Sequence, residues 1–257
     1  KTGQIIEVSN DSLRIMKLTE IIALRLDRLP RGYVFSYQDF SKEVNQREAL
    51  IKALNRMTAS GKIAKLSKGR FYKPERSPFG ELPPPPQQIV KDLLEKRGKA
   101  VGYLTGLSVY PQLGLSTQVS NTIQIGKNET RPAFRRGRYT ISFVKQKNTI
   151  TKENIPLLQL LDSLRYVKKI PDTRVADACQ RLVALIADCS SDEQASLVRL
   201  ALKYPPSARA LLGAMLEQIN PATLNLERLK RSLNPITRYK IPGASKILAE
   251  AGNWNIA

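Results

Sequence analysis

Residues 36 to 73 constrain the fold of this chain more than any other stretch. Ser36-Tyr37-Gln38-Asp39 has the pattern of a capping box, in which a hydroxyl and a carboxylate accept hydrogen bonds from the unpaired N–H groups at a helix start. Asn45-Gln46-Arg47-Glu48 repeats this pattern nine residues later, so a second helix is predicted to begin where the first ends. Two short helices joined in this way are typical of a helix-turn-helix.

The second of these helices is followed by a basic hairpin. The apolar residues of the helix form one stripe at helical spacing: Ala49, Leu50, Ala53, Leu54 and Met57. Gly61 is expected to end the helix. Residues 62–66 and 70–73 are predicted to pair as strands around Ser67-Lys68-Gly69, where the glycine can adopt a positive φ. The whole unit is predicted to be a winged helix with a basic exposed edge.

A proline run gives the clearest domain boundary. Before the capping boxes, apolar residues at intervals of three and four predict a helix over about residues 10–29, and residues 33–35 are either a short strand or an extended link. The four consecutive prolines from Pro83 to Pro86 favour an extended polyproline II spacer. The chain is therefore predicted to contain a winged helix-turn-helix domain over residues 1–80, a proline-rich linker over 81–86 and a C-terminal domain over 87–257.

The C-terminal domain is predicted to combine helices with a small sheet. Helices are expected over residues 87–97 and 103–110, and β-branched and aromatic residues then favour a small sheet over about residues 118–147. From residue 153 to 252, apolar stripes at helical spacing predict a helical bundle. The predicted fold class is therefore α+β and predominantly helical, with an N-terminal winged helix-turn-helix domain followed by a C-terminal domain with a small β-sheet and a helical bundle.

The chain is strongly basic, with 42 Lys and Arg residues against 22 Asp and Glu residues and a formal net charge of +20. Such an excess raises the local concentration of polyanions and speeds their encounter with the protein. Two segments hold much of it: ten basic and three acidic residues lie over 42–76, and seven basic and one acidic residue lie over 127–147. We expect at least one polyanion-binding face.

The residue types that most catalytic sites require are scarce. Histidine is absent, which removes the usual acid or base at neutral pH and the commonest metal ligand. Cys179 and Cys189 cannot complete a tetrahedral zinc site alone, and no phosphate-binding glycine loop is present. The carboxylates between Asp172 and Glu193 have spacings typical of helix caps, and Ser190 with Glu193 forms a capping box. We therefore expect no enzymatic activity, no cofactor and no metal.

The cysteines and the hydropathy pattern indicate a cytoplasmic protein without a membrane partner. No apolar run approaches the roughly 20 residues that span a bilayer, and no signal-peptide pattern is visible. Cys179 shares a helical stripe with Leu182 and Ile186, so it is predicted to be a core residue. Ten residues of helix would hold Cys179 and Cys189 too far apart for a disulfide, which fits a reducing compartment.

Four motifs follow one another in an order that resembles a known family. After the hairpin motif of residues 61–72 come Tyr103-Leu104-Thr105-Gly106-Leu107, then Leu115-Ser116-Thr117-Gln118-Val119, a basic β segment and Leu160-Leu161-Asp162-Ser163-Leu164-Arg165. This order resembles the AbiEi family of antitoxins, from type IV toxin–antitoxin and abortive-infection systems, over about residues 15–220. Ser120 departs from the family pattern, which has proline after the Gln-Val step.

The resemblance implies a transcriptional autorepressor that is also an antitoxin. Its N-terminal domain would bind inverted repeats in the double-stranded promoter DNA of its own operon. Its C-terminal domain would counteract a cognate AbiEii-like nucleotidyltransferase toxin, with which an antitoxin of this type need not form a stable complex. We expect a monomer in solution that binds DNA cooperatively, and the resemblance implies no enzymatic activity.

The second helix and the hairpin are predicted to supply the DNA contacts. Base edges are the expected targets of the helix, because Arg pairs with guanine and Gln or Asn with adenine. A solvated helix end explains Asn55 and Arg56 nearly as well as DNA contact does. A helix N-terminus favours phosphate, and the hairpin would track the backbone or the minor groove. The predicted DNA-binding residues are Ser36, Tyr37, Gln38, Gln46, Arg47, Lys52, Asn55, Arg56, Lys62, Lys65, Lys68 and Arg70.

A second basic cluster lies outside the predicted winged helix. It consists of Lys127, Arg131, Arg135, Arg136 and Arg138. Its arginines lie between two predicted strands, so we expect them to crowd one loop. This loop would be either a second polyanion-binding patch or a patch that faces the toxin. This cluster keeps an alternative function open, a basic RNA-binding or protein–protein adaptor module with a winged-helix domain. A nuclease would need a carboxylate metal site that the sequence does not display.

Overall fold

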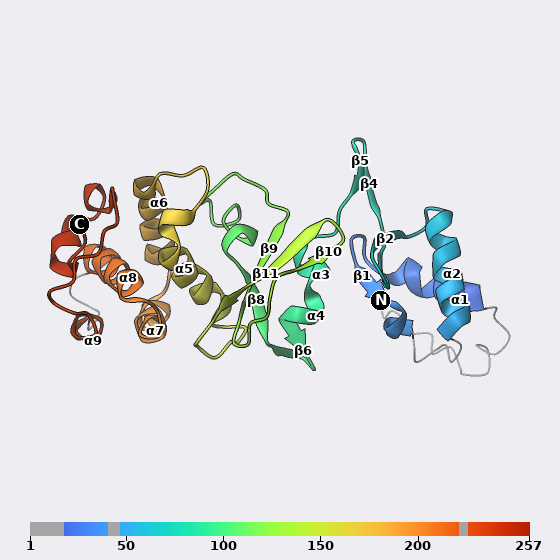
Figure 1. Cartoon of the computed structure of the whole chain (residues 1–257), viewed down its shortest axis with the longest axis horizontal. Helices are drawn as coiled ribbons and strands as arrows, with labels where there is room; N and C mark the ends of the chain where they lie inside the picture. Colours follow the sequence, from blue (N-terminus) through green and yellow to red (C-terminus); the bar gives the residue numbers. More distant parts are fainter. Residues whose placement is uncertain (1–17, 41–46, 221–225) are drawn as a thin grey trace, which may run out of the picture. The chain divides into compact units, whose positions relative to one another are not determined.

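The computed structural model describes residues 18–40, 47–220 and 226–257. It divides the chain into two compact units, Lys1–Val90 and Lys91–Ala257, each of which is considered by itself (Figure 1). The proline run from which the sequence predicted a boundary lies shortly before this division. Helices and small sheets are both present, so the fold is mixed α+β. No helix in the described ranges has the length and apolar character needed to cross a bilayer.

Among its described residues, the first unit packs helices α1 (Leu18–Arg28) and α2 (Arg47–Ala59), a short 3-10 turn and short strands around one apolar core. Helix α1 is followed by strand β1 (Val34–Ser36), the 3-10 turn η2 (Tyr37–Phe40) and helix α2. The core residues come from all of these elements and from the hairpin beyond: Ile22, Leu26, Phe35, Phe40, Leu50, Ala53, Leu54, Ile63 and Phe71. The predicted stripe of the second helix is confirmed, because Leu50, Ala53 and Leu54 are buried.

The region predicted to start a helix at Ser36 forms only a 3-10 turn within the described residues. The carboxylate of Asp39 accepts hydrogen bonds from the backbone N–H of Ser36 at 2.6 Å and from its hydroxyl at 3.1 Å. The Ser36 hydroxyl also accepts a bond from the Gln38 N–H at 3.3 Å. These are the capping partners that the sequence predicted, but β1 extends to Ser36 and the turn begins one residue later. Residues 41–46, where the predicted second helix begins, lie outside the described residues.

The predicted basic hairpin is present. Strand β2 (Ala64–Ser67) pairs antiparallel with β3 (Arg70–Tyr72), and β3 pairs with β1 to give the sheet order β1-β3-β2. Gly69 turns the chain with φ of 72°, as expected for a glycine at this position. Lys73 then joins the hairpin to α1, because its ammonium donates to the carbonyls of Asp27 and Leu29, both at 2.9 Å.

A second hairpin occupies residues 75–82, just before the prolines, where the sequence analysis predicted no hairpin. Strands β4 (Glu75–Ser77) and β5 (Gly80–Leu82) pair antiparallel. The Ser77 hydroxyl accepts from the Phe79 N–H and donates to the Gly80 carbonyl, which closes the turn. Gly80 has φ of 113°, a conformation that few other residues adopt. The proline-rich composition of residues 74–86, with Gly80 among them, therefore reflects a hairpin turn as well as a linker.

The second unit begins with short elements in place of the predicted helix over 87–97. Residues around the unit boundary form two single turns, α3 (Pro86–Ile89) and α4 (Lys91–Leu94). Strands β6 (Glu95–Lys96) and β7 (Lys99–Ala100) then pair across Arg97 and Gly98, which both have positive φ. This geometry is that of a two-residue hairpin loop, so Gly98 is part of a hairpin turn and not a helix end.

The small sheet of the second unit has four strands in the order β10-β11-β9-β8. These are β8 (Gly102–Thr105), β9 (Thr122–Lys127), β10 (Phe134–Arg136) and β11 (Tyr139–Lys145), with β9 and β11 parallel and the other pairs antiparallel. The predicted sheet over 118–147 is confirmed, but the predicted helix over 103–110 is wrong. All four residues of β8 are buried, so its sequence lacks the alternation by which a strand is recognised. Only a 3-10 turn, η3 (Gly106–Ser108), follows it.

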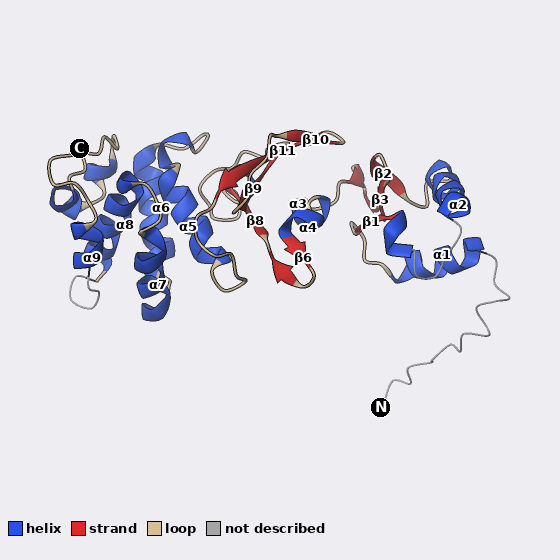
Figure 2. Cartoon of the chain, turned by 60° about the horizontal axis from the view of Figure 1, so that its bottom comes forward, coloured by secondary structure: helices blue, strands red, loops and turns tan. Residues whose placement is uncertain are grey.

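The rest of the second unit is helical (Figure 2). Its helices are α5 (Ile155–Arg165), α6 (Val175–Ala187), α7 (Ser191–Ala201), α8 (Pro206–Ile219) and α9 (Glu227–Arg231), with 3-10 turns η4 (Val167–Lys169), η5 (Ala244–Lys246) and η6 (Ala249–Trp254). The predicted capping box of Ser190 and Glu193 starts α7. Cys179 is buried and free, as predicted, and burial raises its pKa to about 11. Helix α8 and η6 pack so closely that a Cβ at Gly213 would lie 2.2 Å from the Trp254 ring.

Candidate nucleic-acid interface

The solvent face of α2 carries three of the predicted contact residues together. Lys52, Asn55 and Arg56 are exposed and lie at helical spacing opposite the buried stripe. None of their side chains has a hydrogen bond or an ion pair with another described residue. Glu48 lies one turn before Lys52 and is also exposed, so the N-terminal end of this face carries both a negative and a positive charge. The free cations and the amide leave this face able to meet both phosphates and base edges.

Arg47 is held against the 3-10 turn at the first residue of α2. Its guanidinium lies 4.6 Å from the centre of the Tyr37 ring, and its Nη2 donates to the Tyr37 hydroxyl at 3.2 Å. Tyr37 in turn packs against the apolar core. Cation–π stacking and one hydrogen bond restrict the guanidinium while leaving the side chain exposed. The structure therefore brings Tyr37 and Arg47 together, which the sequence had predicted only as separate contacts.

The other predicted residues near the turn have different surroundings. The Ser36 hydroxyl is engaged with Asp39 and Gln38, so its hydrogen-bonding capacity is already used within the chain. The Gln38 side chain is exposed. Gln46 lies outside the described residues. The turn thus places Tyr37 against Arg47 and leaves the Gln38 side chain exposed, whereas the role of Ser36 is to shape the backbone.

The hairpin carries its cations on its exposed edge and tip. Lys65 in β2 and Lys68 in the turn are exposed. Arg70 is half-buried in β3. Lys62 lies 3.5 Å from the Asp27 carboxylate, with both side chains largely open to solvent, so this ion pair contributes little. No atom lies within 4 Å of a Cβ built on Gly69, so the tip is open. Lys65 and Lys68 are therefore the hairpin cations best placed to reach a partner.

The second basic cluster does not form the single crowded loop that the sequence predicted. Arg136 is buried, and its two terminal nitrogens donate to the Asp92 carboxylate at 2.7 and 3.1 Å. It belongs to strand β10, where the side chains of successive residues point to opposite faces. Arg135 before it is therefore exposed, while Arg136 joins the sheet to α4. The function of Arg136 is structural.

The remaining members of this cluster are spread over the strands and their connections. Lys127 is half-buried at the end of β9, with its ammonium 3.5 Å from the Leu93 carbonyl. Arg131 is exposed and covers the rings of Phe134 and Phe143, at 4.5 and 5.4 Å from their centres. Arg138 is exposed and donates to the Tyr139 hydroxyl at 3.0 Å. Arg131, Arg135 and Arg138 thus remain available at the surface, each in a different setting.

A buried carboxylate network is the polar feature that the sequence interpretation missed. Asp162 on α5 accepts hydrogen bonds from the hydroxyls of Tyr103 and Thr105, both at 2.7 Å, and from that of Tyr204 at 2.9 Å. The Gln146 amide donates to both tyrosine hydroxyls, at 2.8 and 2.7 Å. The network therefore joins the sheet to α5 and to the connection between α7 and α8.

Burial is the main influence on the pKa values of the carboxyl and hydroxyl groups in this network. It raises the pKa of Asp162, while the three hydroxyl donors and the charge of Arg165 act in the opposite direction. Burial and the nearby carboxylate also raise the pKa values of Tyr103 and Tyr204, so both hydroxyls remain protonated donors at neutral pH. The sequence contained a signal for the network, because Asp162 interrupts the apolar stripe of its helix. A carboxylate at a core position requires buried partners.

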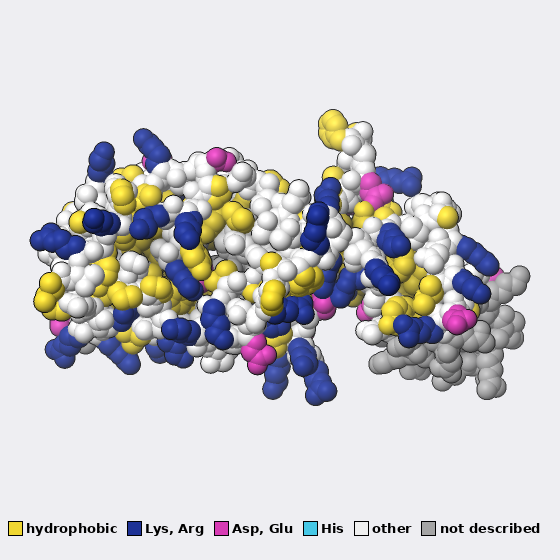
Figure 3. All heavy atoms as spheres, viewed as in Figure 1, with side chains coloured by type: hydrophobic (Ala, Val, Ile, Leu, Met, Phe, Trp, Pro, Cys, Tyr) yellow, Lys and Arg dark blue, Asp and Glu magenta, His cyan; other side chains and the backbone are white. Residues whose placement is uncertain are grey.

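The described surface is rich in lysine and arginine side chains and poor in clusters of metal-binding side chains. Figure 3 shows lysine and arginine side chains over the visible face of each unit, with fewer acidic side chains among them. Within the described ranges, no three Cys, Asp or Glu side chains lie close enough together to hold a metal ion. The visible face of each unit therefore presents more positive than negative side chains.

Comparison with known proteins gives a family and a fold. No curated protein matches the chain. The crystal structure of RV2827C protein from Mycobacterium tuberculosis is similar, with a TM-score of 0.52 at 16% identity over 86% of this chain and 83% of that one. This likeness concerns the fold alone. Residues 21–216 match a family described as "Family of unknown function (DUF6088)". Since this match covers more than half of its length, the chain belongs to the DUF6088 family.

Proposed function

We propose that the first unit is a winged helix that binds the promoter DNA of its own operon. The observation that carries this proposal is the exposed face of α2, where Lys52, Asn55 and Arg56 have no partner among the described residues. The element order supports the same interpretation: β1 lies between α1 and α2, and β2 and β3 follow α2 to complete a three-stranded antiparallel sheet, with a basic turn between β2 and β3. A duplex would meet the helix in its major groove and the hairpin along its backbone.

The side chains divide into base-reading and phosphate-binding groups. Arg47 and Asn55 can make the paired hydrogen bonds that distinguish guanine and adenine. Stacking on Tyr37 orients Arg47 before DNA arrives, which reduces the entropy lost on binding. Lys52, Lys65 and Lys68 are flexible point charges and suit phosphates. Sequence specificity would therefore depend on Arg47 and Asn55, and affinity on the lysines.

The proposed physiological function is that of an autorepressor and antitoxin in a type IV toxin–antitoxin system. This part depends on the resemblance to AbiEi antitoxins, in which the C-terminal domain counteracts a nucleotidyltransferase-like toxin. Tyr103, Thr105 and Asp162 belong to the motifs that carry the resemblance, and they meet in the buried network. Their burial suits a scaffold for the second unit, so toxin neutralisation would use other, exposed residues. A basic RNA-binding or adaptor module remains the alternative.

The proposal is tested by measuring binding of the full chain to its promoter duplex and to a shuffled duplex over a range of salt concentrations. The double variant Lys52→Ala/Arg56→Ala should weaken promoter binding about tenfold or more and should reduce the slope of log affinity against log salt by about 2. Arg28→Ala is the matched control, because Arg28 is an exposed cation of α1 outside the proposed face. Equal affinity for both duplexes at every salt concentration would contradict sequence-specific repression.

Single variants separate the two kinds of contact. Arg47→Ala should lose about 1–3 kcal/mol on the preferred sequence and relax specificity at one base pair. Lys68→Ala should instead weaken all duplexes alike, because a phosphate contact carries no sequence information. If Arg47→Ala also weakens every sequence equally, Arg47 binds phosphate and the assignment of base reading is wrong. A structured RNA that outcompetes the promoter duplex would favour the alternative function.

A further inference from the structure

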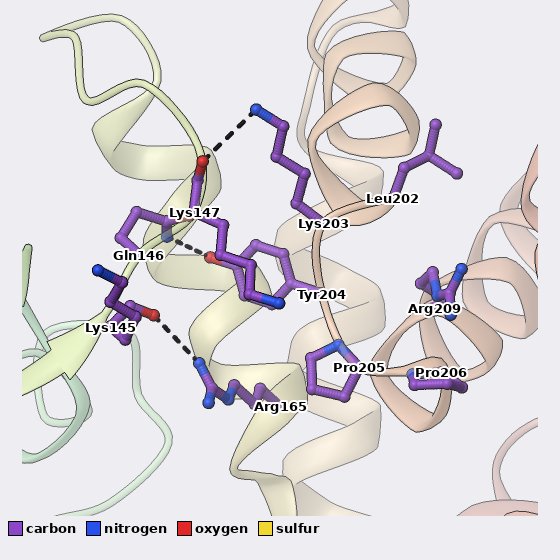
Figure 4. Close-up of a pocket in the computed structure, with 10 residues that line it drawn as sticks. All are labelled: Lys145, Gln146, Lys147, Arg165, Leu202, Lys203, Tyr204, Pro205, Pro206 and Arg209. Atoms are coloured by element: carbon purple, nitrogen blue, oxygen red, sulfur yellow. Dashed lines mark hydrogen bonds between the residues drawn. The ribbon is translucent and has the colours of Figure 1, made fainter. Parts of the chain in front are cut away.

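A basic pocket lies within the second unit, and none of the residues assigned to DNA lines it (Figure 4). It has a volume of about 520 Å³ and is formed by the end of β11, the end of α5 and the connection between α7 and α8. Its lining residues are Lys145, Gln146, Lys147, Arg165, Leu202, Lys203, Tyr204, Pro205, Pro206 and Arg209. A pocket of this size matches the volumes of small-molecule sites.

The charge of the lining is entirely positive. It includes five cations, Lys145, Lys147, Arg165, Lys203 and Arg209, and no carboxylate. The Lys145 ammonium donates to the Asn128 carbonyl, so the other four are the cations best placed for a ligand. Within the described part of the chain, none of these five side chains forms an ion pair. Their mutual repulsion in one concave site is relieved when an anion enters, because the surrounding walls focus the field into the pocket.

Hydrogen bonds to the backbone position several of the cations. Arg165 donates to the Lys145 carbonyl at 3.3 Å, and Lys203 donates to the Lys147 carbonyl at 3.4 Å. These bonds use only one nitrogen–hydrogen of each group, so other donors remain for a ligand. Figure 4 shows the Lys147 side chain extending across the pocket in front of Tyr204. The Tyr204 hydroxyl is itself held between Gln146 and Asp162.

Arg209 adds an unsatisfied buried donor. Its Nε is buried and has no hydrogen-bond partner, whereas most buried polar atoms in proteins are paired. Arg209 belongs to the first turns of α8, which begins at Pro206 on the rim of the pocket. The positive end of the helix dipole therefore adds to the charges of the side chains. Because the Nε is enclosed by protein, an anion in the pocket would contact the other nitrogens of the Arg209 guanidinium.

We propose that this pocket binds a small oligophosphate of nucleotide size. Three or four negative charges would balance most of the five cations, and guanidinium groups match phosphate oxygens in a fork geometry. Leu202, Pro205 and Pro206 give the lining an apolar part that suits a base or a sugar. A DNA duplex presents its phosphates on a convex surface and cannot enter a concave site of this kind. The proposal does not depend on DNA binding by the first unit.

Calorimetric titration of the full chain with ATP, pyrophosphate and inorganic phosphate, without added magnesium, tests this assignment. ATP and pyrophosphate should bind in a one-to-one ratio and more tightly than phosphate. Lys147→Ala/Lys203→Ala removes two exposed cations and should weaken ATP binding about tenfold or more. Arg209→Lys, which keeps the charge but not the fork, should weaken it by a smaller factor of about 3 to 10. Circular dichroism confirms that each variant is folded.

Lys169→Ala/Lys246→Ala is the matched control. It removes the same charge from exposed positions of the second unit outside the pocket, so ATP binding should be unchanged. The proposal is overturned if ATP and pyrophosphate do not bind, or if both double variants weaken binding equally. It is also overturned if a single-stranded oligonucleotide binds in this pocket while ATP and pyrophosphate do not, because the site would then belong to a nucleic acid.

Discussion

Both units expose cations, but among the described residues only the second unit buries charged side chains. In the first unit, Lys52, Arg56 and Lys68 are exposed and have no ion-pair partner among the described residues. In the second, Arg136 is buried against Asp92, and Asp162 is buried beneath three hydroxyl donors. Exposed charges change stability little, whereas a buried charge is tolerated only with its partners in place. Charge density along the sequence therefore does not separate binding residues from structural ones, but burial does.

The largest expected effect is at the centre of the buried network. Asp162→Ala should lower the free energy of unfolding by about 3–5 kcal/mol, because the hydroxyls of Tyr103, Thr105 and Tyr204 lose their shared acceptor. Urea unfolding followed by circular dichroism measures this change. Asp177→Ala is the control, since Asp177 is exposed and, within the described part of the chain, pairs with the exposed Arg174 alone. Equal changes in the two variants would show that burial does not distinguish them.

The next effect compares neighbouring arginines in one strand. Arg136→Ala should destabilise the protein by about 3 kcal/mol, because it leaves Asp92 without its bidentate partner. Asp92 is partly open to solvent, with a side-chain exposure of 35%, which keeps the loss below that of a fully buried pair. Arg135→Ala removes the same charge from the surface and should change stability by less than about 0.5 kcal/mol. Urea unfolding of the two variants in parallel would contradict this comparison if the losses were similar.

The sequence predicted some regions well because their signals are local. The stripe of α2, the turn at Gly69 and the capping box of Ser190 with Glu193 all depend on residues a few positions apart. Periodicity and glycine conformation are sufficient for such elements. The exposed positions Lys52 and Asn55 followed from the same stripe, since a helix that buries one face exposes the other.

Several of the errors occurred where distant partners decide the structure. Strand β8 has the apolar composition of a buried helix, and only its pairing with β9 makes it a strand. In the sequence, Arg136 cannot be distinguished from its exposed arginine neighbours, because its partner Asp92 is far away along the chain. Asp162 likewise required Tyr103 and Tyr204 from both sides of it in the chain. Local patterns carry no information about such contacts.

A smaller effect should appear in the pH dependence of stability. Burial raises the pKa of Asp162, so the folded chain retains a proton that the unfolded chain releases above about pH 4. This contribution to stability is fully present below the unfolded-state pKa and is lost as the pH rises through the folded-state pKa, at up to about 1.4 kcal/mol per pH unit. Asp162→Asn cannot ionise and should lack this decline.

The measurement is urea unfolding of wild type and Asp162→Asn across a series of pH values. Asp177 provides a contrast of opposite sign, because Arg174 lowers its pKa and the resulting stability is lost as the pH falls. Asp177→Asn should therefore differ from wild type above the unfolded-state pKa of Asp and converge with it in acid. A difference between wild type and Asp162→Asn that stays constant with pH would show that Asp162 does not titrate within that range.

The smallest expected effect on stability concerns the exposed arginines of the second unit. Arg131→Ala/Arg135→Ala/Arg138→Ala keeps the buried Arg136 and should lower the free energy of unfolding by no more than about 1 kcal/mol in total. Most of that loss would come from Arg131, which covers the rings of Phe134 and Phe143. Because the fold is preserved, any change in binding can be attributed to the removed charges.

This triple variant also decides which unit the exposed arginines serve. Reduced promoter affinity with a shallower salt slope would show that DNA bound by the first unit also reaches these arginines. Intact repression with lost protection against the toxin would instead separate the two units by function, as the resemblance to AbiEi antitoxins implies. If both activities survive, exposure alone does not identify a binding residue, and Arg131, Arg135 and Arg138 are solvated side chains. In that case burial would still predict which charged residues affect the free energy of unfolding, but exposure would not predict which residues bind a partner.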